Sequence, residues 1–228
     1  MNRNILFSSL IFLSIIALAA CTTTPASTNV TPGNTAPSAT NEPGVNTPVP
    51  ANTSSNTDTG TMSNLACTGE NTSANVTIEL TEGPYYTAGS PEDATLYEEG
   101  MPGTKLVVTG YVYDTNCQPV ANAWLDFWQA NANGEYDNSG YTLRGHQYTD
   151  ANGFYTLTTV VPGIYPGRTE HIHFKVQAPN GQVITSQLFF PDVAQNESDN
   201  IYDESLLLPV QETSDGLQAQ FNFVVPAP

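Results

Sequence analysis

Two tyrosines and two histidines lie close together in the second half of the chain: Tyr136, Tyr165, His171 and His173. Residues i and i+2 of a β-strand point to the same face, so the imidazoles of His171 and His173 could meet a single ion. Each tyrosine follows a glycine-containing turn. Two phenolates and two imidazoles make a hard, anionic set of oxygen and nitrogen ligands, which favours a trivalent cation such as Fe(III) over a thiolate-preferring metal. The residues therefore predict a non-haem ferric site.

The segments around these residues resemble the iron-binding motifs of the intradiol ring-cleavage dioxygenases. Tyr136 is the last residue of the first such segment, Trp124-Leu-Asp-Phe-Trp-Gln-Ala-Asn-Ala-Asn-Gly-Glu-Tyr136. The second tyrosine stands in Pro162-Gly-Ile-Tyr165-Pro-Gly-Arg168-Thr-Glu-His171-Ile-His173. A third similar segment is Thr81-Glu-Gly-Pro-Tyr-Tyr86, and the resemblance runs roughly from residue 67 to residue 202. A lone His-x-His pair is weak, but the joint spacing of Tyr, Tyr and Arg-x-x-His-x-His is highly specific.

The resemblance implies a cofactor, a substrate class and a reaction. Non-haem Fe(III) would be bound by Tyr136, Tyr165, His171 and His173, with Tyr136 equatorial and Tyr165 axial. The substrates would be a small catecholic aromatic compound and O2, and the ring would open between the hydroxyl-bearing carbons to give a muconate-type diacid. Tyr165 would also be catalytic, because it would take a substrate proton and leave the metal.

Five further positions acquire roles from the same resemblance. Arg168 would stabilise carbanionic charge on the ring carbon that meets O2, and it would contact the substrate. Gln187 would assist oxygen activation by hydrogen bonding. Thr81, Pro84 and Tyr85 match positions that line the substrate ring. Tyr85 is larger and more polar than the leucine common there in catechol-cleaving members, which argues against plain catechol as the preferred substrate.

The charge balance excludes two classes of partner. The chain has 22 Asp and Glu residues against 5 Lys and Arg residues, a formal net charge of −17. Nucleic acid and anionic membrane surfaces both require a basic patch, so neither is an expected partner. The oligomeric state cannot be predicted from the sequence.

The N-terminal region indicates export and anchoring. Arg3 precedes an apolar run, Ile5 to Ala20, that is short for a membrane span. The run ends in Leu-Ala-Ala-Cys21, which resembles a bacterial lipoprotein signal, and residues 1–20 would then be removed and Cys21 acylated. A plain secretory signal with a chance cysteine is the alternative. Residues 21–64, rich in Thr, Pro, Asn and Ser, read as a flexible tether. We therefore expect an extracytoplasmic, lipid-anchored protein that contacts the membrane only through this anchor.

Two cysteines remain once Cys21 is assigned to the lipid. Disulfides persist in oxidising compartments, so Cys67 and Cys117 are expected to pair. A pair of free, buried thiols is the alternative reading.

The remaining segment, residues 65–228, predicts an all-β domain. Short runs with strand character are separated by Gly, Pro, Asn and Asp, and no long segment repeats with helical period. We expect a β-sandwich with little helix, with one helical turn or a loop near 199–206. The expected strands cover residues 105–114, 123–128, 154–161, 170–177, 183–190 and 217–225.

Two other functions fit parts of the sequence. A non-catalytic surface β-sandwich for adhesion or sugar binding is compatible with the fold, because fold alone does not assign function. A zinc hydrolase is the weaker possibility, since zinc sites rarely use two tyrosines. The joint presence of two tyrosines and two histidines at these intervals favours the iron enzyme.

Overall fold

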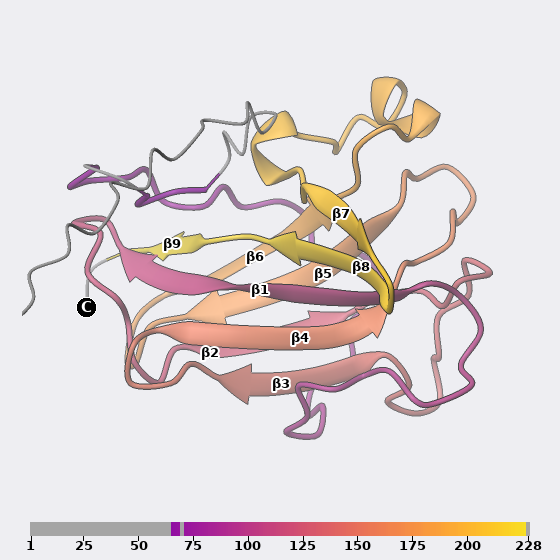
Figure 1. Cartoon of the computed structure of the whole chain (residues 1–228), viewed down its shortest axis with the longest axis horizontal. Helices are drawn as coiled ribbons and strands as arrows, with labels where there is room; N and C mark the ends of the chain where they lie inside the picture. Colours follow the sequence, from indigo (N-terminus) through magenta and orange to yellow (C-terminus); the bar gives the residue numbers. More distant parts are fainter. Residues whose placement is uncertain (1–64, 69–70, 227–228) are drawn as a thin grey trace, which may run out of the picture. The chain divides into compact units, whose positions relative to one another are not determined.

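Two β-sheets, packed face to face, make up the folded part of the chain (Figure 1). The computed structural model describes residues 65–68 and 71–226. The predicted signal peptide, Cys21 and the predicted tether lie outside these residues. The described residues confirm the predicted all-β sandwich, and none of their helices has the length and apolar character needed to cross a membrane.

The first sheet is organised around its long strand β1. Its strand order is β4-β1-β8-β7, and β9 also pairs with β1. β1 runs antiparallel to β4 and parallel to both β8 and β9. The strands are β1 (Lys105–Asp114), β4 (Phe154–Val160), β7 (Val210–Thr213), β8 (Gly216–Gln220) and β9 (Phe223–Val225).

The second sheet is antiparallel throughout and has the order β3-β2-β5-β6. Its strands are β2 (Trp124–Trp128), β3 (Arg144–Tyr148), β5 (His171–Gln177) and β6 (Val183–Phe189). Two short 3-10 helices follow β6, η1 (Ala194–Glu197) and η2 (Glu204–Leu206).

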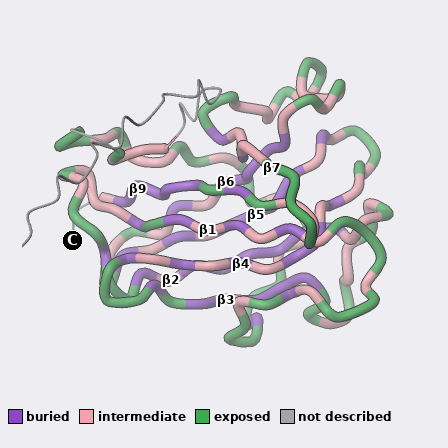
Figure 2. Tube along the Cα trace, viewed as in Figure 1, coloured by how far each residue is buried: buried purple, intermediate pink, exposed green. Residues whose placement is uncertain are grey.

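The core lies between the two sheets and is formed by alternating residues of their strands (Figure 2). Val108 of β1, Phe127 of β2 and Phe174 of β5 are all fully buried there. Burying one such side chain contributes about 1.5–3 kcal/mol. The first four residues of β5 are buried on both faces of the sheet. Other parts of the chain must therefore cover the outer face of the sheet at this end of β5.

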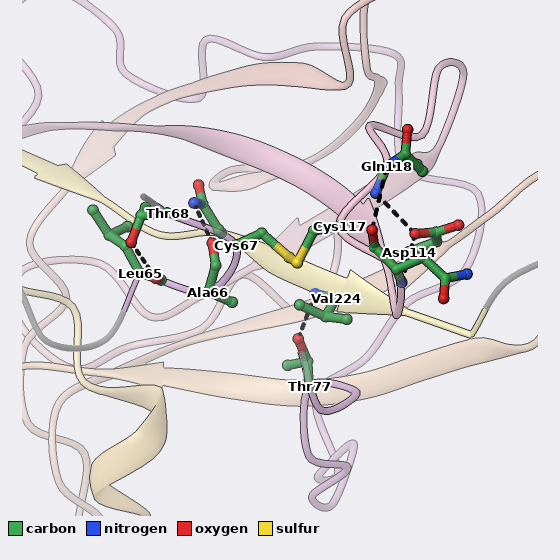
Figure 3. Close-up of a disulfide and its surroundings, with 11 residues drawn as sticks. Leu65, Ala66, Cys67, Thr68, Thr77, Asp114, Cys117, Gln118 and Val224 are labelled. Atoms are coloured by element: carbon green, nitrogen blue, oxygen red, sulfur yellow. Dashed lines mark hydrogen bonds between the residues drawn. A yellow bond between two sulfur atoms is a disulfide. The ribbon is translucent and has the colours of Figure 1, made fainter. Parts of the chain in front are cut away.

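A disulfide joins Cys67 to Cys117, with their Cα atoms 5.2 Å apart (Figure 3). Cys117 lies in the turn after β1, where the Asp114 side chain accepts hydrogen bonds from the backbone N–H groups of Asn116 and Gln118. The bridge therefore ties the start of the described chain to the end of β1 in the first sheet.

Three details of the predicted strands differ from the structure. β3 and β7 were not expected from the sequence. The last predicted strand, 217–225, is two strands, because the chain breaks at Phe221 and Asn222. There the Asn222 side chain accepts from Tyr111 N and donates to Ala66 O, and the buried Tyr155 hydroxyl donates to Phe221 O. These side-chain bonds, with the backbone bond from Phe221 N to Thr109 O, hold the chain to the first sheet at the break.

Candidate active site

The predicted ligands His171 and His173 lie on the outer face of the second sheet, at the covered end of β5. His173 is paired with Trp128 on one side and with Gln187 on the other. Arg144 is paired in turn with Trp128. Because directly paired residues of neighbouring strands project from the same face, this register places Arg144, Trp128, His173 and Gln187 in one row across the sheet.

The two predicted tyrosine ligands come from loops that touch through their backbones. Asn131 O accepts hydrogen bonds from Gly134 N at 2.9 Å and from Gly163 N at 2.8 Å. A Cβ atom on Gly163 would lie 2.4 Å from Ala132 O, and one on Gly134 would lie 2.2 Å from Ile164 O. Glycine is therefore required at both positions for the loops to approach so closely.

Three potential donor atoms converge beside the sheet. The Nε2 atoms of His171 and His173 are 3.1 Å apart, and Tyr136 Oη lies 3.3 Å from His171 Nε2. His171 Nδ1 donates to Thr169 O at 2.6 Å. A carbonyl oxygen only accepts, so Nδ1 carries the proton and the Nε2 lone pair faces the other donors. Burial lowers the pKa of His171 to about 4 and also lowers that of His173, so both imidazoles are neutral at pH 7.

His173 is oriented by packing. Its ring lies parallel to the Trp128 ring, with centroids 4.8 Å apart. A Cβ atom on Gly83 would be 3.3 Å from His173 Cε1, so the 81–86 segment also packs against this ring. The buried Nδ1 atom has no hydrogen-bond partner among the described residues. Packing alone therefore aims Nε2 of His173 at Nε2 of His171.

The convergent atoms fit a metal ion. Metal–imidazole bonds are about 2 Å long, so two ligand atoms at roughly right angles on one ion lie about 3 Å apart. At that distance one tautomer of His173 donates from Nε2 to His171 Nε2, whereas the other tautomer leaves both Nε2 lone pairs free to bind one cation. No three His, Cys, Asp or Glu side chains of the described residues group together to hold an ion, and the third convergent atom is the phenol oxygen of Tyr136.

The phenol of Tyr136 also fits a cationic partner. Burial raises its pKa, and the nearby positive charge of Arg168 only partly opposes this effect. The phenol is therefore protonated without a metal, and a bound trivalent cation would favour the phenolate. Tyr165 stands edge-on to the Tyr136 ring, with centroids 6.1 Å apart, and edge-on to the His171 ring at 6.4 Å. All four predicted ligands are thus neighbours, and together they match the hard oxygen and nitrogen set of Fe(III).

The predicted catalytic residues form a chain of hydrogen bonds beside the histidines. Arg168 Nη2 donates to Gln187 Oε1, and Gln187 Nε2 donates to Thr81 O at 2.9 Å. Arg168 Nε donates to Asp199 Oδ2 at 2.9 Å. Gln187 is fully buried and Arg168 is half-buried. The network therefore fixes the guanidinium close to the ligand cluster.

Of the predicted substrate-contacting residues, Tyr85 lies directly on the ligands. Its ring stacks on Tyr136 and stands edge-on to Tyr165. Thr81 joins the network through its carbonyl group. Pro84 is exposed, at the start of the turn that carries Tyr85.

Sequence reasoning missed the role of Arg144. Its buried guanidinium donates from Nη1 to Tyr85 O at 2.6 Å and from Nε and Nη2 to Asp137 O. Arg144 therefore clamps the Tyr85 turn to the loop that carries Tyr136. One signal in the sequence could have indicated this role. The chain has only 5 Lys and Arg residues against 22 Asp and Glu residues, so each basic residue is a candidate for a specific contact.

Comparisons with known proteins agree with this geometry. The sequence model of the family described as Dioxygenase matches residues 81–226. The dioxygenase domain of a dioxygenase–carbohydrate-binding protein fusion from Streptomyces sp. SirexAA-E is 44% identical, with a TM-score of 0.66; the match covers 68% of this chain and 100% of that one. The 3-chlorocatechol 1,2-dioxygenase of Rhodococcus opacus 1CP is 29% identical, with a TM-score of 0.60; the match covers 67% of this chain and 73% of that one.

Curated relatives are similar over a shorter share of their length. The hydroxyquinol 1,2-dioxygenase of Rhizobium sp. (strain MTP-10005) is 31% identical over 167 residues, which are 60% of this chain and 56% of that protein. The chain spans about half the length of the curated relatives it matches. Since the family match covers more than half of this chain, including every predicted ligand, the chain belongs to the intradiol ring-cleavage dioxygenase family.

Proposed function

We propose that this protein is a non-haem Fe(III) dioxygenase that opens a catecholic ring between its two hydroxyl-bearing carbons. Both atoms of O2 would enter the product, a muconate-type diacid. The observation that carries the proposal is the convergence of His171 Nε2, His173 Nε2 and Tyr136 Oη at 3.1 and 3.3 Å. Bound Fe(III) would supply the Lewis acidity and one-electron chemistry that allow a catecholate to react with O2.

Side chains of the protein would accept the substrate proton and stabilise the negative charge that develops on the substrate. Tyr165 is the more accessible candidate to accept a proton from a substrate hydroxyl, because its loop is half exposed, whereas Tyr136 is covered by Tyr85. Arg168 would stabilise negative charge as it builds on the ring carbon that meets O2. Gln187 would hold the guanidinium in place and offer its amide to oxygen.

The substrate class is a small catechol carrying a ring substituent. Relatives of this chain are named for hydroxyquinol, catechol, 3-chlorocatechol and protocatechuate. The Tyr85 ring occupies space beside both tyrosine ligands and presents a phenol to that space. This polar wall supports a substituted catechol over catechol itself.

Oxygen uptake by iron-loaded protein tests the proposal with catechol, protocatechuate and hydroxyquinol in parallel. We expect turnover of at least one of them, and loss of iron and turnover in His171→Ala. Uptake no faster than with iron salt alone, for all three compounds, would instead favour the non-catalytic surface module.

We also propose that the protein is exported and held at the bacterial membrane by lipid on Cys21. The disulfide between Cys67 and Cys117 supports export, since disulfides persist mainly in oxidising compartments. Metabolic labelling with a fatty acid tests the anchor: Cys21→Ser should lose the label and release the protein from the membrane fraction. A labelled Cys21→Ser protein would contradict lipidation at this residue.

A further inference from the structure

Asp199 reaches the site from the irregular segment between η1 and η2, 31 residues beyond Arg168. Its side chain is only 2% exposed although it carries a charge. Burying a carboxylate is costly unless several donors surround it. The hydrogen-bond partners of the Asp199 carboxylate therefore indicate why this charge is buried.

Both oxygens of the Asp199 carboxylate are in use. Oδ2 accepts from Arg168 Nε and from the backbone N–H of Thr169, each at 2.9 Å. Oδ1 accepts from the backbone N–H of Ile201 at 2.9 Å. One oxygen thus binds two consecutive residues of the segment that leads into the histidine pair, while the other oxygen is anchored in its own loop.

The first contact fixes the orientation of Arg168. Asp199 holds Nε and Gln187 holds Nη2, so rotation of the guanidinium would break two bonds at once. The Nη1 group donates to no other described residue. The Nη1 group of the immobilised guanidinium is therefore free to donate to a negatively charged atom of a substrate.

The second contact fixes the orientation of His171. Thr169 is fully buried, and its carbonyl accepts the Nδ1–H of His171 at 2.6 Å. Asp199 holds the N–H of this same residue, and the Thr169 hydroxyl donates to Asn196 Oδ1 at 2.5 Å. The segment after β6 therefore sets the position of the carbonyl that selects the imidazole tautomer.

We infer that Asp199 is a positioning residue that acts on the reaction through two arms, Arg168 and the Thr169–His171 unit. The Arg168 arm rests on the function proposed above, while the His171 arm concerns metal binding and is independent of turnover. Partners of this kind behind metal ligands commonly change metal affinity or activity by about 10–100-fold when removed.

The test compares full-length, iron-loaded Asp199→Ala, Asp199→Asn, Arg168→Ala and the Asp199→Ala/Arg168→Ala double variant. The control is Glu197→Gln, which removes an exposed carboxylate from the same segment. Iron affinity, visible spectrum, kcat per bound iron, KM and melting temperature are measured for each. Asp199→Asn keeps the side-chain volume and one acceptor oxygen, and so provides a second variant if Asp199→Ala folds poorly.

We expect Asp199→Ala to bind iron about tenfold more weakly and to lose about 10–100-fold in kcat per bound iron, mostly without a change in KM. Asp199→Asn should be intermediate, and Glu197→Gln should match the wild type. Arg168→Ala should keep its iron affinity. The double variant should turn over no more slowly than Arg168→Ala, because residues acting as one unit are not additive.

Two results would overturn the inference. One is a lower melting temperature in both Asp199 variants with unchanged iron affinity and unchanged kcat per bound iron, since that describes a purely structural ion pair. The other is a double variant in which the two losses of kcat per bound iron multiply, since Asp199 would then not act on turnover through Arg168. If the wild type shows no turnover, the proposed function fails, and iron affinity alone decides: a tenfold loss in Asp199→Ala supports the inference and an unchanged value refutes it.

Discussion

The ring of Tyr85 lies on the ring of Tyr136, with centroids 4.4 Å apart and planes 19° from parallel. A residue of the proposed substrate wall is thus in direct contact with a residue of the proposed iron site. Aromatic pairs of this kind contribute about 0.5–1.5 kcal/mol beyond their buried area. If the proposed function holds, Tyr85 influences both the shape of the substrate site and the environment of a proposed ligand.

Tyr85→Leu should raise kcat/KM for plain catechol relative to a substituted catechol, because it removes the bulky phenol beside the two ligands. It should also shift the visible tyrosinate-to-iron absorption, since Tyr136 loses its stacking partner. Tyr85→Phe is the matched control, and it should keep the absorption while revealing any role of the hydroxyl. A Leu variant with an unchanged substrate ratio and an unchanged spectrum would refute this role.

Gly163→Ala should cost the protein its iron and its colour. The added methyl group would collide with Ala132 O at 2.4 Å and Gly134 N at 2.6 Å, and would force the two tyrosine loops apart. Iron content and visible absorption are the measurements. Gly100→Ala is the control: its φ of +84° is strained for alanine, but no atom lies within 4 Å of the new Cβ. Equal iron content in the two variants would contradict the proposed loop contact.

Arg144→Lys should destabilise the protein although it preserves the charge. A single ammonium cannot reproduce the planar fork that serves Tyr85 O and Asp137 O together. A fully buried carbonyl left without a partner costs about 1–3 kcal/mol, which is the upper bound for these two partly buried groups. Denaturant unfolding should show this loss, and the visible spectrum should broaden as the Tyr85 turn loosens. Wild-type stability in Arg144→Lys would show that the clamp is unimportant.

The Cys67→Ser/Cys117→Ser double variant should lose about 4 kcal/mol of stability, because the bridge closes a loop spanning 50 residues. Its iron content and spectrum should stay normal, since the bridge is attached to the first sheet and the histidine ligands lie on the second. Thermal unfolding with and without a reductant checks the first expectation. If the reductant still lowered the melting temperature of the double variant, its effect would not come from the Cys67–Cys117 disulfide.

The sequence was most informative where function depends on local spacing. His171 and His173 are two residues apart on one strand, so their shared face follows from period-two geometry. Their joint spacing with Tyr136 and Tyr165, matched to the family's motif, predicted four ligands, and the structure places these four residues side by side. The strands β1, β4 and β5 were likewise visible as alternating or β-branched runs.

Contacts between distant segments could not be predicted in the same way. Asp199 lies in an irregular segment with no pattern that points to Arg168, and the contact exists only because the chain folds back after β6. β3 was missed because its sequence, Arg-Gly-His-Gln-Tyr, contains a glycine and shows no alternation of apolar and polar residues. The break at Asn222 depends on a side-chain bond to Tyr111, a residue in another strand.

The fate of labelled oxygen tests the central claim most directly. Iron-loaded protein is supplied with heavy-isotope O2 and the catechol that it turns over fastest, and the product is analysed by mass spectrometry. The account predicts a muconate-type diacid opened between the hydroxyl-bearing carbons, carrying both atoms of the labelled O2. A ring opened beside the hydroxyl pair, or an oxidised but intact ring with no label, would contradict it.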